Sequence, residues 1–141
     1  MEVVTLERTL TELDHVRLLN LLRRDVRGDA AFAGQTQTIE DVLDASALVP
    51  SREVTSDVVT MSSQVLLRDL QTRQRSTLTL CYPADAVPAA GLVSVLSPVG
   101  TALLGLRRGS IARWSTPTGD QRAAEIVDIL FQPESSGDYA M

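Results

Sequence analysis

Two residues in the sequence could act as a nucleophile or a general base, Cys81 and His15, and each is the only one of its type. A disulfide needs two cysteines, and a zinc site closed by Cys and His needs four ligands, so neither can form within this chain. Cys81 lies in an alternating apolar run, which favours a small core residue over a nucleophile. His15 lies in a stretch with helical periodicity, far in sequence from most serines. We therefore expect no enzyme, no catalytic residue, no metal site and no cofactor.

The charge of the chain argues against nucleic-acid binding. Its 141 residues include 13 Arg, no Lys and 18 acids, for a net charge of -5. Affinity for nucleic acid comes mostly from Lys and Arg that neutralise phosphates, so we expect no strong direct binding. Residues 1–54 carry 10 acids and 6 Arg, whereas residues 55–141 carry 8 acids and 7 Arg. We interpret the absence of Lys as an effect of genome composition.

No targeting or membrane segment is expected. Glu2 stands where a signal peptide needs positive charge. The uncharged stretch 86–106 has about the length of a membrane span, but proline and glycine interrupt it repeatedly. The single thiol also suits a reducing compartment. We expect a cytoplasmic protein.

The first third of the chain shows helical periodicity twice. Thr11, followed three residues later by Asp14, approximates a capping box. An apolar stripe then runs to about Gly28 and consists of Leu13, Val16, Leu19, Leu22 and Val26, widened by Leu18 and Leu21. A second start at Thr38–Asp41 opens a shorter stripe, ended by Pro50, of Ile39, Val42, Leu43 and Ala45. Two such helices predict an antiparallel hairpin within residues 1–54. Periodicity leaves open whether this hairpin packs on the protein or projects from it.

Beyond a polar linker at residues 51–57 the period changes from helix to strand. We expect strands at 58–61, 64–70, 76–82, 92–96, 111–115 and 124–131, a further extended segment at 3–6, and a loose tail from Pro133. The sequence thus predicts an α+β fold, in which a short N-terminal helical hairpin precedes an antiparallel sheet with one short helix in residues 55–141.

The segment 97–109 has the strongest local signals. Ser97 is a good N-cap, and Pro98 suits the first helical position because its missing N–H is not needed there. Gly105 fits the position where a left-handed backbone ends a helix, and the two arginines that follow suit the negative end of the helix dipole. These signals predict a helix at 98–104 between two strands.

This segment carries a resemblance to a known family. Residues 93–106 resemble the "ISxxSPLGxALLG" signature in the C-terminal domain of the GreA/GreB transcription elongation factors. Pro117–Gly119 resembles the family's "PxG" turn, and residues 125–131 resemble its closing strand. Gly109–Ser110 stands where the family usually has Gly-Asp. The resemblance implies an FKBP-like fold for residues 55–141.

Over nearly its whole length the chain is also similar to a group of smaller proteins in this family, the regulators of nucleoside diphosphate kinase. Thr11–Asp14 resembles their "TELD" start. Residues 57–65 resemble "DVVTMNSRV", with Ser62 in place of Asn. Residues 82–86 and 132–139 resemble "YPxDA" and "QPExxGDY".

The resemblance implies a partner and a docking site. Factors of this family bind RNA polymerase at the rim of its secondary channel through the C-terminal domain, with the hairpin pointing inward. By position, the docking residues here would be Ser97, Pro98, Leu103 and Leu104. A helix of two turns must also bury something, so Leu103 or Leu104 could instead belong to the core. An apolar residue left exposed there would be the partner patch.

In GreA/GreB factors two acids at the hairpin tip support metal-assisted transcript cleavage, because Mg²⁺ requires hard oxygen ligands. The corresponding region here offers Asp25 and Asp29. They are four residues apart and would share a face of a continuous helix, but Gly28 interrupts it. Their spacing differs from the Asp-x-x-Glu of the family, and arginines flank them. We expect solvated turn residues and no stimulation of cleavage.

The expected function is therefore that of a monomeric transcription regulator that binds RNA polymerase and competes with Gre factors. Other functions stay open. The chain could be a cleavage factor that uses the tip acids, or a regulator of the level of nucleoside diphosphate kinase. A prolyl isomerase is disfavoured because the chain has few aromatics, and a DNA-binding protein is disfavoured by the acidic balance. The five aromatic residues are Phe32, Tyr82, Trp114, Phe131 and Tyr139.

Overall fold

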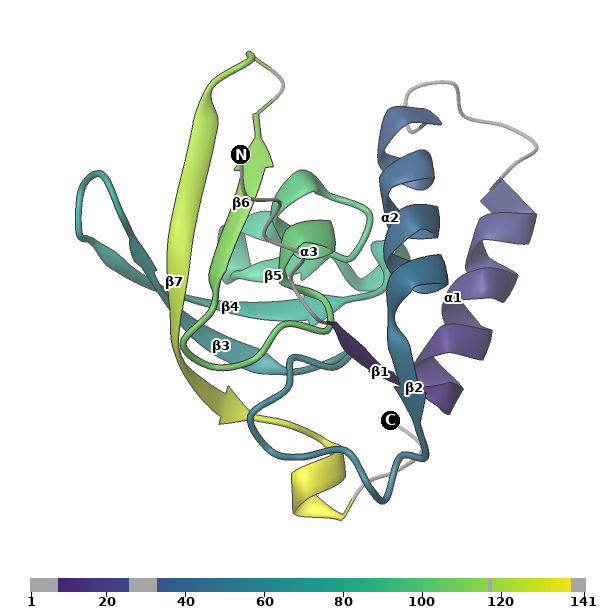
Figure 1. Cartoon of the computed structure of the whole chain (residues 1–141). Helices are drawn as coiled ribbons and strands as arrows, with labels where there is room; N and C mark the ends of the chain where they lie inside the picture. Colours follow the sequence, from purple (N-terminus) through teal and green to yellow (C-terminus); the bar gives the residue numbers. More distant parts are fainter. Residues whose placement is uncertain (1–7, 26–32, 117, 138–141) are drawn as a thin grey trace, which may run out of the picture.

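The computed structural model describes residues 8–25, 33–116 and 118–137, which adopt a mixed α+β fold (Figure 1). The elements follow in the order β1 (Thr9–Thr11), α1 (Glu12–Asp25), α2 (Ala33–Ala45), β2 (Ala47–Val49), β3 (Gln64–Asp69), β4 (Arg75–Cys81), β5 (Leu92–Ser94), α3 (Pro98–Leu103), β6 (Ile111–Ser115) and β7 (Gln121–Phe131). Short 3₁₀ turns occupy Pro83–Asp85, Pro88–Ala90 and Glu134–Ser136.

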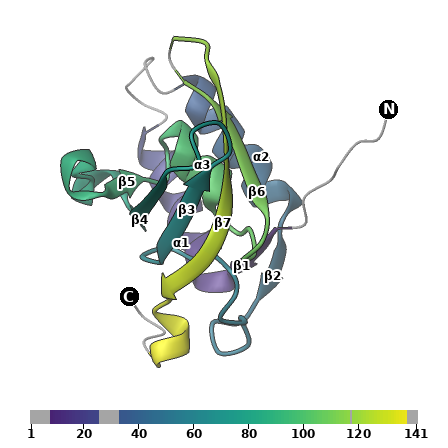
Figure 2. The ribbon, with the colours of Figure 1, turned by 90° about the vertical axis from the view of Figure 1, so that its left-hand side faces the viewer.

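Five strands form one curled sheet in the order β5-β4-β3-β7-β6. Its neighbouring strands run antiparallel except β4 and β5, which are parallel, so the expectation of a purely antiparallel sheet is wrong at this edge. The sheet curls around α3, and α1 and α2 stand beside it (Figures 1 and 2). A separate parallel ribbon of β1 and β2, which the sequence did not predict, lies at the base of these two helices.

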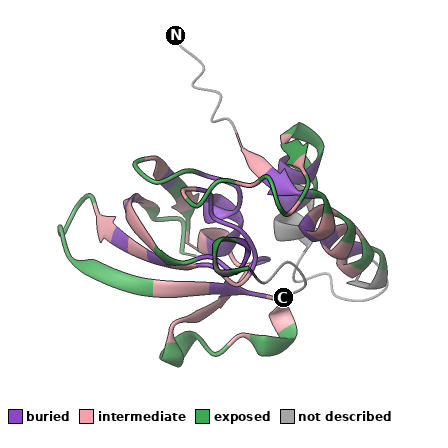
Figure 3. Cartoon of the chain, turned by 90° about the horizontal axis from the view of Figure 1, so that it is seen from below, coloured by how far each residue is buried: buried purple, intermediate pink, exposed green. Residues whose placement is uncertain are grey.

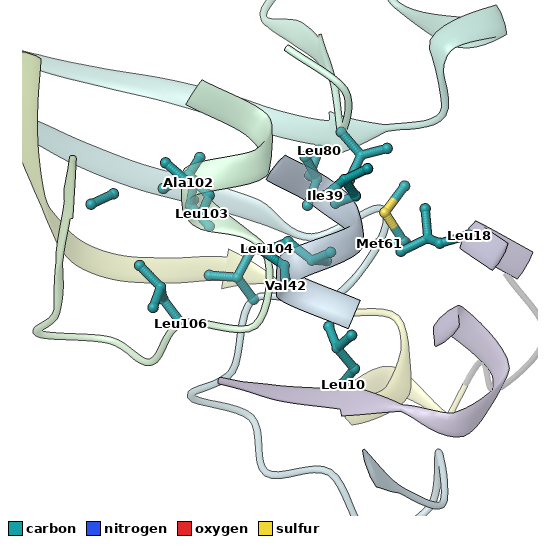
Figure 4. Packing of buried hydrophobic residues seen from close by; sticks show 14 of the residues in the cluster. Leu10, Leu18, Ile39, Val42, Met61, Leu80, Ala102, Leu103, Leu104 and Leu106 are labelled. Atoms are coloured by element: carbon teal, nitrogen blue, oxygen red, sulfur yellow. The ribbon is translucent and has the colours of Figure 1, made fainter. Parts of the chain in front are cut away.

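The helices and the sheet share one hydrophobic core (Figures 3 and 4). The sheet contributes Val65, Leu67, Leu80 and Ile126, the first two helices contribute Leu18, Leu22, Ile39, Val42 and Leu43, and α3 and its C-terminal end contribute Leu103 and Leu104. Burying one such side chain stabilises the fold by about 1.5–3 kcal/mol. The described parts of α1 and α2 are therefore joined to the sheet through a common core, with α2 beside α3.

Helix α2 buries the stripe predicted for it. Ile39, Val42 and Leu43 are buried, although Ala45 is exposed. The helix begins at Ala33, before the predicted start, and β2 follows it directly.

Helix α1 buries only part of the predicted stripe and adds an acid to the buried face. Asp14, Leu18 and Leu22 are buried at four-residue spacing, whereas Val16 is 53% exposed and Leu19 is half-buried. The prediction was right for Leu18 and Leu22 and wrong for Val16, because it counted only apolar residues and a buried carboxylate, Asp14, is part of this face. Of the predicted stripe, Val26 lies outside the described residues.

Residues 58–61 do not form the predicted strand. Val58 makes an isolated bridge with Arg107, and the Val59 N–H donates to the Leu106 carbonyl at 2.9 Å. This segment is buried as a connection between the linker and β3. The predicted strands at 64–70, 76–82 and 111–115 are present within a residue or so of their bounds, and β7 starts earlier than expected.

The two ends of the described chain are tied to the fold. Gln132 and Glu134 are buried, so the expectation of a loose tail from Pro133 is wrong for its first residues. The extended segment predicted at 3–6 lies outside the described residues.

Among the helices that the structure describes, none combines the length and the apolar character needed to cross a membrane.

Candidate functional site

The N-terminus of α3 is capped as the sequence predicts. The Ser97 hydroxyl oxygen accepts a hydrogen bond from the Gly100 N–H at 3.2 Å and donates to the Ser94 carbonyl at 2.6 Å. Pro98 occupies the first helical position. These contacts hold the chain at a sharp corner between β5 and α3.

Gly100 allows α3 to lie directly on β5. A Cβ atom at this position would be 2.0 Å from the Ser94 carbonyl oxygen, a distance that no side chain can occupy. One residue later, the Thr101 hydroxyl donates to the Val95 carbonyl at 2.6 Å. The glycine is therefore required by the close approach of the two backbones.

The C-terminal end of α3 is held by the start of the chain. The Arg8 guanidinium Nη1 donates to the carbonyls of Leu104 at 2.8 Å and of Thr101 at 3.0 Å. A cation is favoured at this end of a helix because the free carbonyls are partly negative. Burial lowers the pKa of Arg8 below its usual value, but arginine stays protonated in proteins.

Arg107 and Arg108, which the sequence suggested for this role, lie elsewhere. Arg107 lies 3.6 Å from Asp57, and Arg108 lies 3.6 Å from Asp128, measured between nitrogen and oxygen. Gly105 has the expected positive φ, +81°, and its carbonyl accepts a hydrogen bond from the Thr9 N–H at 3.0 Å.

The corner separates the four predicted docking residues into two pairs. Leu103 and Leu104 are 0% exposed and pack in the core (Figure 4), so they cannot contact a partner directly. Both leucines therefore belong to the core, which was the second of the two roles considered for them. Ser97 and Pro98 are partly exposed, as is Val99 beside them. The surface that the corner offers to a partner is therefore the segment 97–99.

Comparison with known proteins accounts for this corner. Residues 54–131 match the family described as transcription elongation factor, GreA/GreB, C-terminal. The chain belongs to the GreA/GreB family. Among its relatives is the regulator of nucleoside diphosphate kinase from Escherichia coli K12, with 35% identity over 134 residues, which cover 94% of this chain and 95% of the relative. The transcription elongation factor GreA from Clostridium acetobutylicum is 30% identical over 96 residues, 67% of this chain and 61% of that protein.

The fold agrees with a solved member of the GreA/GreB family. The prokaryotic transcription elongation factor GreA/GreB from Nitrosomonas europaea superposes with a TM-score of 0.73 and 34% identity. The match covers 89% of this chain and all of that one.

The two acids that the sequence predicts at the hairpin tip lie at the edge of the described residues and beyond it. Asp25 is the last residue of α1, and its side chain is not among those described, while Asp29 lies outside the described residues. Within the described part of the chain, no three Asp, Glu, His or Cys side chains gather as metal ligands would.

A second polar arrangement, which we call the polar cluster, joins α1 to both ends of the sheet domain. It consists of Asp14, Thr60, Met61, Ser63 and Glu134. The Asp14 Oδ2 atom accepts from the Met61 N–H at 3.1 Å, and the Thr60 hydroxyl donates to Glu134 Oε1 at 2.7 Å. The Thr60 N–H donates to the Ser63 hydroxyl oxygen at 2.9 Å. The turn 60–63 is thus held by a buried carboxylate on each side.

The capping box prediction identified one member of this cluster for a different reason. The Thr11 hydroxyl oxygen accepts from the Asp14 N–H at 3.1 Å, which confirms Thr11 as the cap of α1. The Asp14 side chain, however, reaches across to Met61. Sequence spacing could not show this contact because its partners are 47 residues apart.

Electrostatics distinguish Asp14 from an ordinary surface carboxylate. Burial raises the pKa of Asp14 to about 6; the Met61 hydrogen bond opposes this rise, and the nearby Glu134 charge reinforces it. Burial also raises the pKa of Tyr82, with the Asp14 charge acting in the same direction. Asp14 therefore lies in a site where negative charge is costly.

Gln132 ties the end of β7 to the linker, a role that the sequence did not signal. Its side-chain amide donates to the carbonyls of Thr55 and Val58, both at 2.8 Å. The prediction that Cys81 is a core residue is confirmed, since Cys81 is buried and burial raises the pKa of its thiol.

Proposed function

We propose that this protein is a transcription regulator that binds RNA polymerase through the segment 97–99. One observation carries the proposal. The family signature is retained from Val93 to Leu106, its apolar half is buried, and the part left accessible is the rigid turn at Ser97 and Pro98. The buried leucines thus act as the scaffold of the docking turn.

The rigidity of this turn supports a docking role. The hydroxyl of Ser97 is hydrogen-bonded to both the helix and the strand, and Gly100 lets the helix lie in direct contact with β5. A surface held in one conformation loses little entropy when it binds a partner. The proposed contact lies at the rim of the secondary channel of the polymerase, as the resemblance implies.

The finer description of the fold is part of the proposal. Residues 1–54 would form a short helical hairpin and its linker, and residues 55–141 an FKBP-like domain that carries the docking turn. The match of the family model to residues 54–131 supports this division. The protein would act as a cytoplasmic monomer.

The protein is proposed to bind without stimulating transcript cleavage, and hence to act as a competitor of Gre factors rather than as an enzyme. The support is the spacing of Asp25 and Asp29, which differs from that of the family's cleavage acids, together with the flanking Arg24 and Arg27. A transcript-cleavage assay on stalled complexes checks this point, and cleavage above background would contradict it.

A binding assay with immobilised RNA polymerase tests the docking turn. Pro98→Ala removes a partly exposed ring at the turn, and Pro88→Ala is the matched control because Pro88 also begins a helical turn on the surface. We expect Pro98→Ala to weaken binding about fivefold or more and Pro88→Ala to change it less than about twofold. Absence of binding by the unaltered protein at micromolar concentration would overturn the proposal.

A second candidate function is regulation of nucleoside diphosphate kinase, which the name of the E. coli relative favours. In our proposal such an effect acts through transcription. The activity of purified nucleoside diphosphate kinase with and without an excess of this protein tests the alternative. A direct change in its rate would favour the alternative, and an unchanged rate would favour the indirect route.

A further inference from the structure

A groove of about 230 Å³ lies between α1 and α2, away from the docking turn. Leu19, Leu22 and Leu43 form its apolar part, and Arg23, Glu40 and Asp44 line it with charge. An apolar cavity of about 150 Å³ accepts a benzene-sized molecule, so this groove has room for one large apolar side chain.

The α1 side of the groove combines a core leucine, Leu22, with a partly exposed one, Leu19. Leu18 and Leu22 face the core, whereas Leu19 is only half-buried, and Val16 one turn earlier is 53% exposed. Residues three apart lie on the same side of a helix, so Val16 extends the apolar surface beside Leu19. Sequence periodicity predicted burial for both residues, but Leu19 packs against the core with only part of its side chain and Val16 stays more than half exposed.

The charge of the α2 side indicates what kind of chain would cover this surface. Helix α2 contains three acids, Glu40, Asp41 and Asp44, and no basic residue. All three acids are exposed. Among the described residues that line the groove, Arg23 is the one cation beside Glu40 and Asp44, so the described lining is net negative.

This charge disfavours a second copy of the same chain. Two copies that joined through this face with α2 against α2 would bring their acidic helices together, and like charges across an interface cost free energy. A basic segment would be attracted to the same surface and would leave the apolar groove available for an anchor residue.

We propose that the α1–α2 groove is an interaction surface for a polypeptide segment that inserts one large apolar side chain and flanks it with Arg or Lys. The surface is formed by other elements than the docking turn and does not depend on polymerase binding. Because the groove is small, the affinity for an isolated segment is expected in the micromolar range.

Fluorescence anisotropy with a labelled synthetic peptide tests the proposal. The probe is a peptide of about 13 residues with a central Phe among Arg and Lys. Two control peptides replace either the Phe by Ser or the basic residues by Glu. We expect saturable binding of the probe, with a loss of about tenfold or more for each control peptide.

Two double variants of the full chain separate a local contact from general charge attraction. Glu40→Arg with Asp44→Arg replaces the two negative charges of the groove by positive ones. Glu53→Arg with Asp85→Arg makes the same charge change at exposed sites outside the groove. We expect the groove variant to weaken probe binding about tenfold or more and the control variant less than about threefold. When the probe is titrated into the labelled protein, the largest changes in NMR amide chemical shift should fall at Leu19, Leu22 and Leu43.

Four results would overturn the proposal. They are no saturation at millimolar probe, equal binding of the Phe→Ser peptide, equal loss in the two double variants, and amide shifts that map elsewhere. Sedimentation of the unaltered chain provides one more check. A dimer that the groove variant converts to a monomer would assign the groove to a second copy and would overturn the proposal as well.

Discussion

The corner at α3 and the polar cluster at Asp14 hold the same core together by opposite means. At the corner, backbone meets backbone so closely that only glycine fits at position 100, and Leu103 and Leu104 anchor α3 in the apolar core. At the cluster, the buried carboxylates of Asp14 and Glu134 accept hydrogen bonds from the turn 60–63. The corner therefore depends on shape and is insensitive to pH, whereas the cluster depends on protonation.

The comparison also separates what the chain shares with different relatives. The corner carries the signature that resembles GreA/GreB factors in general. The cluster is built from the segments that resemble the regulators of nucleoside diphosphate kinase, at Asp14, Thr60 and Glu134. Similarity to that smaller group thus corresponds to one buried polar contact set, formed by segments far apart in the sequence.

The largest effect is expected at the corner. Gly100→Ala places a Cβ atom 2.0 Å from the Ser94 carbonyl, so α3 must move off β5. We expect the free energy of unfolding to fall by about 3 kcal/mol or more, as overpacked cores show. Urea unfolding measures it.

Gly109→Ala is the control for this prediction. Gly109 has φ +92° but no atom within 4 Å of an added Cβ, so only backbone strain is introduced. A cost of about 1 kcal/mol is expected there. Equal losses in the two variants would show that close approach is not what position 100 requires.

The next effect tests the electrostatics of the cluster. The pKa of Asp14 is about 6 in the folded protein, above the ordinary value of 3.8. Between these values the folded state binds more protons than the unfolded state, so stability falls as pH rises. We expect deprotonation of Asp14 to lower the free energy of unfolding by about 1–3 kcal/mol as the pH rises from about 4 to about 7.

Asp14→Asn should flatten this pH dependence, while Asp41→Asn, at an exposed site on α2, should leave it unchanged. Asp69 does not interfere, because hydrogen bonds from Thr72, Arg122 and Gln71 lower its pKa to about 2. Its contribution is lost only as pH falls below the ordinary value. A slope that persists in Asp14→Asn would assign the effect to another group.

The smallest effect concerns Ser62, which lies in the turn 60–63 that the polar cluster holds. Ser62 adopts φ +68°, a left-handed conformation that Asn tolerates better than Ser. The related "DVVTMNSRV" segment has Asn at this position. We expect Ser62→Asn to stabilise the protein by about 0.5 kcal/mol in thermal unfolding. Ser56→Asn, at an exposed residue without positive φ, should have no such effect, and destabilisation by Ser62→Asn would contradict this reading of the turn.

Local signals predicted the corner better than the cluster, and the reason is physical. The Ser97 cap, Pro98 and Gly105 act on backbone groups a few residues away, so their spacing shows in the sequence. The Arg8 contact with Leu104 spans 96 residues and leaves no local pattern.

The same limit explains the errors in the helical half. The alternation of β3 and the stripe of α2 were visible because burial follows their periodicity, whereas burial in β4 increases toward Cys81 instead of alternating. The face of α1 was not, since Asp14 is buried there by a hydrogen bond to a distant turn. The ribbon of β1 and β2 likewise depends on pairing between segments that flank both helices.

The central claim is that the accessible turn of the corner contacts RNA polymerase. Replacement of Pro98 by a photo-crosslinking residue, with the same replacement at Pro88 as control, tests it most directly. The account predicts a cross-link to polymerase from position 98 alone, and its loss when a GreA factor is added in excess. A cross-link from position 88 alone, or a position 98 cross-link that the GreA factor does not reduce, would contradict it.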